Sequence, residues 1–99
     1  MPFVSCMLTR PASEAQCDTL KVAITGAMDG IAGKGEQYLM VAVQPDVTLF
    51  FQGDIVNASA YLDVRYVGQF PRNVKERLAE SLSDAVADIM SVAKNRVYV

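Results

Sequence analysis

The 99-residue sequence contains no histidine and only two cysteines. Without histidine, the commonest general base and metal ligand is missing, so acid–base chemistry would need Asp, Glu, Lys, Tyr, Cys or a terminal amine. Cys6 and Cys17 are too few for a disulfide framework or a zinc site. We interpret both as small buried hydrophobic residues, in keeping with reduced thiols in the cytoplasm.

The chain also lacks an excess of positive charge and a long apolar run. Its formal net charge of −2 offers no electrostatic footprint for a phosphate backbone. No apolar run approaches the roughly 20 residues that cross a bilayer, and no basic segment followed by an apolar stretch opens the sequence. We therefore expect a cytoplasmic protein with no nucleic-acid partner, no membrane association and no classical secretion signal.

What the chain does have is apolar character, with 52% hydrophobic and 20% charged residues. The length predicts a single domain over residues 1–99 with a modest core. An apolar excess on so short a chain indicates that another subunit covers part of its surface.

The first half predicts strand, helix, strand. Residues 2–8 are apolar on both faces, as in a covered strand. Ser13 and Gln16 have the spacing of a capping box that starts a helix, and "GKGE" at residues 33–36 ends it. Residues 38–45 predict the next strand, and residues 47–53 a short strand that leads into a turn at Gly53. The helix would bury one apolar stripe: Cys17, Leu20, Ile24, Met28 and Ile31.

The second half repeats this order. Residues 58–68 predict a strand with Leu62, Val64 and Tyr66 on one face. Asn73 and Glu76 predict another capping box, and residues 95–99 a closing strand. The second apolar stripe is Val74, Leu78, Leu82, Val86, Ile89 and Ala93.

The two halves form an internal repeat of structure, since Ser13 and Asn73 lie 60 residues apart. The predicted fold class is α+β: two pseudo-repeated β-α-β units forming one four-stranded mixed sheet. Right-handed crossovers place both helices on one face of that sheet. The opposite face is then bare and needs a partner, which favours an oligomer.

Pro2 is the first candidate for chemistry. Once Met1 is removed, its ring nitrogen is a secondary amine, and α-amino groups titrate at roughly pH 7.7–8.0, close to the range that suits a general base. The alternative is a strand that simply begins with proline, a position where the missing N–H costs little.

An ordered set of motifs resembles the macrophage migration inhibitory factor family and its tautomerase relatives over essentially the whole chain. The set comprises Pro2 on the first strand, "GK" at residues 33–34, "YLMVAVQPD" at 38–46, "YVG" at 66–68 and "NRVYV" at 95–99. Family members carry "GK" followed by a tyrosine, then "VPD", "SIG" and "DRVYI" in the same order.

The resemblance implies a homotrimeric keto–enol tautomerase acting on phenylpyruvate-like 2-oxo acids, with no cofactor. Pro2 matches the family's general base, and Lys34 matches the lysine that binds the substrate carboxylate and keeps the proline nitrogen neutral. The backbone of Val67 would line the pocket and Tyr38 its rim. Tyr98 matches a tyrosine that a neighbouring subunit contributes.

Each of these residues also has an ordinary structural role. A lysine after a helix-ending glycine commonly interacts with the helix C-terminus, and Val67, Tyr38 and Tyr98 are typical strand residues. Two alternatives therefore stay open. One is a non-enzymatic trimeric cytokine-like or binding protein with a vestigial pocket, and the other is a small-ligand regulatory domain of ferredoxin-like organisation.

The sequence departs from the family pattern at three points. "SAYL" at residues 59–62 replaces a Cys-x-x-Cys pair, which excludes the thiol–disulfide activity of that pair. The sequence ends at Val99, whereas the family continues with a segment that lines the pocket. Pocket closure, substrate choice and the level of activity therefore stay open, as does the choice between a natural short form and a fragment. A retained Met1 would turn the Pro2 nitrogen into an amide and remove the base.

Acidic residues also recur four apart on the second predicted helix, at Glu76, Glu80, Asp84 and Asp88. A calcium site would need converging loop oxygens, so we interpret this ridge as a solvated helix face and expect no metal.

Overall fold

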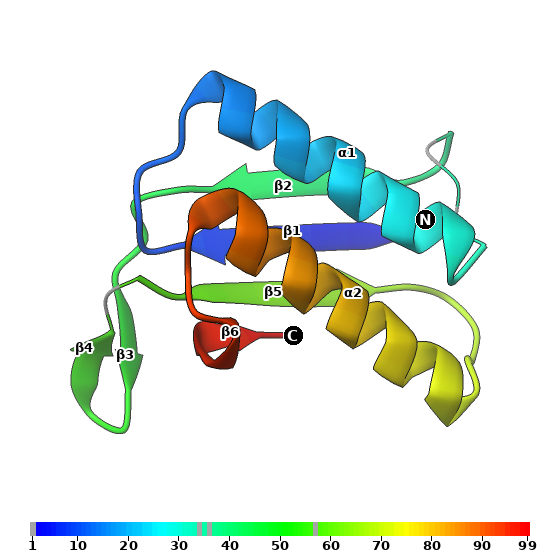
Figure 1. Cartoon of the computed structure of the whole chain (residues 1–99). Coiled ribbons are helices and arrows are strands. Elements are labelled where there is room, and N and C mark those ends of the chain that lie inside the picture. Colours follow the sequence, from blue (N-terminus) through cyan, green and yellow to red (C-terminus); the bar gives the residue numbers. More distant parts are fainter. Residues whose placement is uncertain (1, 34, 36, 57) are drawn as a thin grey trace.

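The helices and strands follow one another in the order that the sequence predicts, except that a β-hairpin lies in the middle, where the sequence predicts one short strand (Figure 1). The computed structural model describes residues 2–33, 35, 37–56 and 58–99, with the backbone alone for 54–56. The elements are β1 (Phe3–Leu8), α1 (Glu14–Gly30), β2 (Met40–Gln44), β3 (Leu49–Phe51), β4 (Asp54–Val56), β5 (Ala60–Arg65), α2 (Arg72–Met90), a 3-10 turn (Lys94–Arg96) and β6 (Val97–Tyr98).

The main sheet has the strand order β2-β1-β5-β6. Strand β1 runs parallel to β2 and antiparallel to β5, and β5 runs parallel to β6. Both helices cross the same face of this sheet (Figure 1). The predicted fold class, two β-α-β units sharing one mixed four-stranded sheet with the helices on one face, is confirmed.

The capping box predicted at the start of α1 is confirmed. The Gln16 backbone N–H donates to Ser13 Oγ at 3.1 Å, and the Ser13 N–H donates to Gln16 Oε1 at 2.9 Å. The first backbone N–H groups of a helix have no acceptor within the helix, and these two hydrogen bonds satisfy two of them. The helix ends at Gly30, and Gly33 follows with a φ of +67°, a conformation in which glycine carries no Cβ penalty.

The capping box predicted at the start of α2 is wrong. The helix starts at Arg72, after Pro71, and no side chain caps it. Proline fixes a φ compatible with helix entry, so the helix begins before Asn73, which lies in the first turn instead of at the cap. Glu76 accepts a hydrogen bond from Arg72 Nε at 2.9 Å.

The apolar stripe of α2 also ends earlier than predicted. Ser91 takes a left-handed conformation with a φ of +55° and terminates the helix, so Ala93 lies beyond it and is exposed. Met90, which is 3% exposed, occupies the last inward position of the helix instead.

The core lies between the two helices and the face of the sheet that they cover. Alternate residues of β1 point into it, and each fully buried aliphatic side chain contributes about 1.5–3 kcal/mol. The largest fully buried side chains are Leu8, Leu20, Ile24, Met28, Leu62, Leu82, Val4 and Val86. The predicted stripes of both helices therefore supply most of the helical side of the core.

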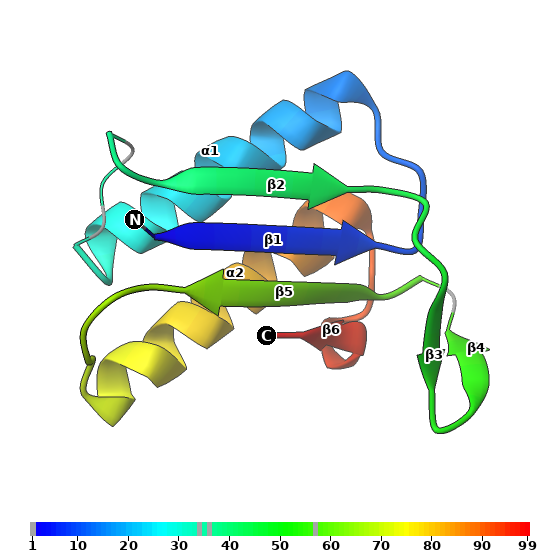
Figure 2. The ribbon, with the colours of Figure 1, turned by 180° about the vertical axis from the view of Figure 1, so that it is seen from behind.

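The hairpin formed by β3 and β4 was only half predicted. The sequence indicated one short strand before Gly53, whereas Phe51 and Asp54 pair across a two-residue turn. Gln52 and Gly53 take φ values of +54° and +86°, as in the turns that best match strand twist. This hairpin is a separate two-stranded sheet beyond one end of the main sheet (Figure 2).

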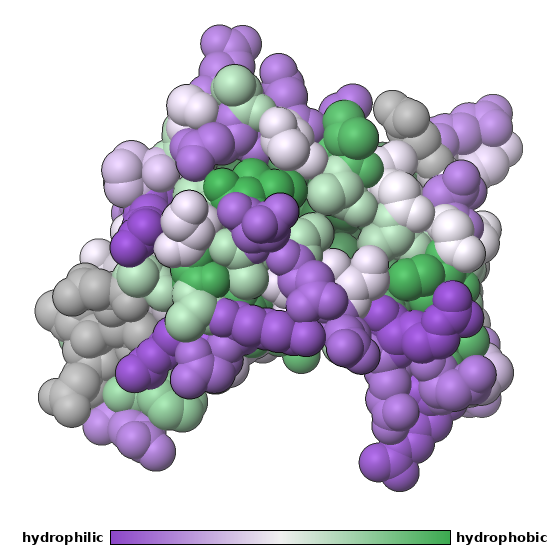
Figure 3. Space-filling view, in the orientation of Figure 1, coloured by the Kyte–Doolittle hydropathy of each residue, from purple (hydrophilic) through white to green (hydrophobic). Residues whose placement is uncertain are grey.

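The other face of the main sheet carries no helix (Figure 2). Met40 is 55% exposed and Tyr61 is 47% exposed, both from strands of this sheet. On the helix side, hydrophilic residues cover much of the surface, with apolar residues in patches between them (Figure 3). Exposed apolar side chains on an uncovered sheet are typical of an interaction surface.

No helix within the described parts of the chain combines the length and apolar character needed to span a bilayer.

Candidate active site

Pro2 lies immediately before β1 and is half-buried. Its carbonyl oxygen accepts a hydrogen bond from the Met40 N–H at 3.1 Å, which extends the β1–β2 pairing by one residue. Proline needs no partner for an N–H here, so the first position of a strand suits it. The hydrogen bond from β2 therefore holds the backbone of Pro2 at one end of the sheet, where β1 starts.

Tyr38 and Val67 lie at this same end of the sheet. Phe3 is in register with Met40 of β2 and with Arg65 of β5, so the start of β2 and the end of β5 flank the start of β1. Tyr38 is 64% exposed and Val67 is 78% exposed. The structure thus brings Pro2, Tyr38 and Val67 to one end of the sheet. The side chains of Tyr38 and Val67 are exposed there and open to a ligand or to another chain.

Local contacts shape the two segments that carry these residues. The Tyr38 N–H donates to the Gly35 carbonyl at 3.2 Å, which closes a turn before β2. Tyr66 stacks on Phe70 with ring centroids 4.3 Å apart, and this contact closes the turn that holds Val67. Lys34, the expected carboxylate anchor, falls outside the described residues, as does Met1.

Tyr98 lies at the opposite end of the sheet from Pro2. It is in register with Tyr61 of β5, which in turn pairs with Met7 near the end of β1. Its ring stacks on Phe51 of the hairpin, with centroids 5.5 Å apart. One chain therefore does not bring Tyr98 and Pro2 together.

The two cysteines are free thiols on different elements. Cys6 in β1 is fully buried, whereas Cys17 in α1 is half-buried. Burial, and secondarily the nearby Cys17, raises the pKa of the Cys6 thiol to about 11. A thiol with so high a pKa has almost no nucleophilic thiolate at neutral pH, so Cys6 acts as part of the core.

The acidic ridge of α2 is partly neutralised by a lysine from the following turn. Lys94 Nζ lies 2.7 Å from Asp84 Oδ1 and 3.6 Å from Glu80 Oε1. The hydrogen bond to Asp84 is the main reason that the pKa of the Lys94 ammonium lies above its ordinary value. Among the residues that the structure describes, no cluster of three or more His, Cys, Asp or Glu side chains could hold a metal ion.

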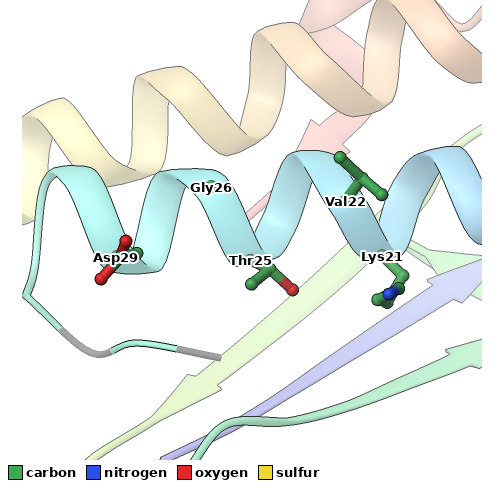
Figure 4. A pocket seen from close by; sticks show the side chains of 5 residues that line it. All are labelled: Lys21, Val22, Thr25, Gly26 and Asp29. Carbon is green, nitrogen blue, oxygen red and sulfur yellow. The ribbon is translucent and has the colours of Figure 1, made fainter. Parts of the chain in front are cut away.

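Two of the surface hollows in the described part of the chain are lined by residues other than Pro2. One, of about 270 Å³, is lined by residues of α1 alone, and Gly26, which has no side chain, lies between Val22 and Asp29 along the helix (Figure 4). Because its lining residues lie along a single helix, this hollow brings no groups from separate elements together. The other, of about 230 Å³, lies beside Tyr98 and is lined by residues of the hairpin, β5, β6 and the segment before β5: Leu49, Phe50, Phe51, Ser59, Tyr61 and Tyr98.

Sequence reasoning missed two features near these positions. Arg65 pairs in register with Phe3, next to Pro2, and its Nε and Nη2 both donate to Asp63 Oδ2, at 3.1 and 3.0 Å. Spacing alone hinted at this pair, because residues two apart on a strand share a face. The aromatic hollow at Tyr98 left no such signal, since its residues are far apart in the sequence.

The fold matches solved structures over nearly the whole of this chain and over about four-fifths of theirs. The structure of Leishmania major MIF2 has a TM-score of 0.88 at 21% identity, covering 100% of this chain and 84% of that chain. Macrophage migration inhibitory factor of Toxoplasma gondii has a TM-score of 0.83 at 26% identity, covering 97% of this chain and 83% of that one.

A fused 4-OT symmetric trimer has a TM-score of 0.87 at 17% identity, covering 98% of this chain and 80% of that chain. No curated protein matches the sequence significantly. The family model described as macrophage migration inhibitory factor (MIF) matches residues 1–99. With the mixed sheet, the paired helices and Pro2 at the start of β1, this match over the whole chain means that the protein belongs to the macrophage migration inhibitory factor family.

Proposed function

We propose that this protein is a keto–enol tautomerase that acts on phenylpyruvate-like 2-oxo acids, with Pro2 as the general base. The observation that carries the proposal is the position of Pro2, at the start of β1 beside the exposed Tyr38 and Val67, in a member of this family. A small substrate that binds at this end of the sheet, beside the two exposed side chains, would meet the Pro2 amine.

The chemistry needs one proton carrier and one anchor. After Met1 is removed, the neutral Pro2 nitrogen takes the proton from the carbon next to the substrate carbonyl, and the carbonyl oxygen takes a proton from solvent to give the enol. The protonated Pro2 then releases its proton to solvent, which restores the neutral base. Lys34 binds the carboxylate, and its positive charge disfavours a protonated proline. This role of Lys34 rests on the match of "GK" at residues 33–34 to the family pattern, since Lys34 lies outside the described residues.

A homotrimer completes the proposed site. The uncovered sheet face with Met40 and Tyr61 supports assembly, as does the fold shared with fused 4-OT trimers. In such a trimer, Tyr98 of one subunit would complete the site of its neighbour. This arrangement accounts for a tyrosine that one chain holds far from Pro2.

The test compares phenylpyruvate tautomerisation by Met1-free protein with that of Pro2→Gly. We expect loss of about 10²–10⁴-fold in kcat/KM, the range typical of a general base. Pro11→Gly, at an exposed position of the β1–α1 connection, is the matched control and should keep full activity. Intact mass establishes whether Met1 is present in each sample.

Equal rates for Met1-free wild type and Pro2→Gly would overturn the assignment of the base. A correctly processed trimer with no activity would favour the alternative, a non-enzymatic binding protein of the same fold.

A further inference from the structure

Asp63 and Arg65 of β5 are the only charged residues in the four strands of the main sheet. Leu62 of the same strand lies in the core, and Val64 packs against it. Because side chains alternate along a strand, Asp63 and Arg65 point to the opposite face, which carries no helix (Figure 2). Charges on a face that another subunit covers are costly unless they are paired. This pair is therefore the feature of the face that needs a function.

Arg65 lies at the Pro2 end of the sheet. It is the last residue of β5 and lies directly opposite Phe3, the residue that follows Pro2. Residues directly opposite on antiparallel strands have Cβ atoms roughly 4.5–5.5 Å apart. Val67, exposed at the same end, follows Arg65 by two residues. A substrate that reaches the Pro2 nitrogen therefore meets the surface from which Arg65 projects.

The Arg65 guanidinium is oriented by Asp63 and still has donors to offer. Its Nε and Nη2 donate to Asp63 Oδ2 at 3.1 and 3.0 Å, which uses the side edge of the planar group. The end edge, formed by Nη1 and Nη2, keeps N–H donors that neither bond uses. The side chain is 73% exposed, so this end edge is open to a ligand. Orientation before binding lowers the entropy cost of binding.

We propose that Arg65 binds a second acidic group of the substrate, so that the protein prefers 2-oxo dicarboxylic acids to 2-oxo monocarboxylic acids of the same length. This inference rests on the proposed function and deepens it. Lys34 would bind the carboxylate next to the carbonyl, and Arg65 the carboxylate at the other end of the molecule. Two adjacent guanidinium N–H donors match the two oxygens of a carboxylate, whereas an alkyl or phenyl group leaves them unused.

The test compares 2-oxopentanedioate with 2-oxopentanoate, which has a methyl group in place of the second carboxylate. NMR titration of the Met1-free protein measures binding, and deuterium exchange at C3 follows the proton transfer. We expect the dicarboxylate to bind about tenfold more tightly, since contacts between charged groups are strong but Asp63 and solvent weaken this one. The preference should fall as NaCl is added. This comparison on wild-type protein does not depend on the folding of a variant.

Arg65→Gln removes the charge and should bring the ratio of the two affinities close to one. Arg65→Lys keeps the charge without the planar pair of donors and should retain an intermediate preference. Arg72→Gln is the matched control, because it also removes an arginine whose Nε donates to an acid, Glu76 Oε1, at 2.9 Å. Arg72 lies on α2, on the helix side of the sheet, so the wild-type ratio should remain.

Equal affinities of the wild type for the two acids would overturn the proposal, as would a preference that Arg65→Gln leaves unchanged. Failure of the proposed tautomerase function is a different result. In that case neither acid would exchange deuterium, whereas the ratio of affinities and its loss in Arg65→Gln would still be measured by the titration.

Discussion

Within one chain, Pro2 and Tyr98 lie level with opposite ends of β1. The Pro2 carbonyl, at the start of β1, pairs with Met40 of β2, whereas Tyr98 of β6 aligns, through Tyr61 of β5, with Met7 near the end of β1. Pro2 and Met7 are five residue steps apart along an extended strand, and at about 3.3 Å per step this is roughly 16 Å. A single substrate contacted by both residues must therefore lie between two chains.

Subunit complementation tests this arrangement. Pro2→Gly and Tyr98→Ala should each impair tautomerisation, the first through kcat and the second mainly through KM. When the two variants are refolded together, about a quarter of the sites in randomly mixed cyclic trimers receive Pro2 from one chain and Tyr98 from its neighbour. We expect about a quarter of wild-type activity, measured by phenylpyruvate tautomerisation.

The control is a mixture of the same variants folded separately, in which no chains exchange and activity stays low. Native mass spectrometry should verify that the refolded sample contains mixed trimers. Mixed trimers without recovered activity would show that each site takes both residues from one chain, or that Tyr98 takes no part.

The layout of the fold could be predicted because apolar periodicity directly reports burial. Leu20, Ile24 and Met28 recur at helical spacing, and each is fully buried against the sheet. Strand β4 gave no such signal, since three residues beginning with Asp54 are too few to show a period. The start of α2 was mispredicted because Pro71, rather than the side chain of Asn73, determines where that helix begins.

The site was less accessible to sequence reasoning than the fold. Pro2 has no local signature of function, and only its resemblance to a family gives it a role. The hollow beside Tyr98 depends on the contact between Phe51 and Tyr98, which are 47 residues apart in the sequence and meet only in the folded chain. No local sequence pattern could have revealed it.

The two predicted helix starts should differ in their contribution to stability. Ser13→Ala removes the side-chain acceptor of the Gln16 N–H and should lower the free energy of unfolding by about 0.5–2 kcal/mol. Asn73→Ala is the control, because no side chain caps α2, and it should change stability by only about 0.5 kcal/mol or less. Urea denaturation gives both values, and equal losses would contradict the assigned helix starts.

Two glycines should respond in opposite directions to alanine. Gly26 lies inside α1, and a Cβ there would meet no atom within 4 Å, so Gly26→Ala should stabilise the protein by about 0.5–1 kcal/mol. Gly53 has a φ of +86° in the β3–β4 turn, where Gly53→Ala should cost about 1–2 kcal/mol. Thermal unfolding measures both, and a stabilising Gly53→Ala would rule out the left-handed turn.

The buried Cys6 should make the protein less stable in alkali. Its folded-state pKa is raised from 9.0 to about 11, mainly by burial. Between these values the unfolded chain binds fewer protons than the folded chain, so the free energy of unfolding falls as pH rises. The full loss is on the order of 2–3 kcal/mol.

Urea unfolding from pH 8 to pH 11 should show a shallower decline in the free energy of unfolding for Cys6→Ala than for wild type. Ser83→Ala, at a half-buried position of α2, is the control and should keep the wild-type slope. An unchanged slope in Cys6→Ala would mean that this thiol ionises as readily in the folded chain as in the unfolded one.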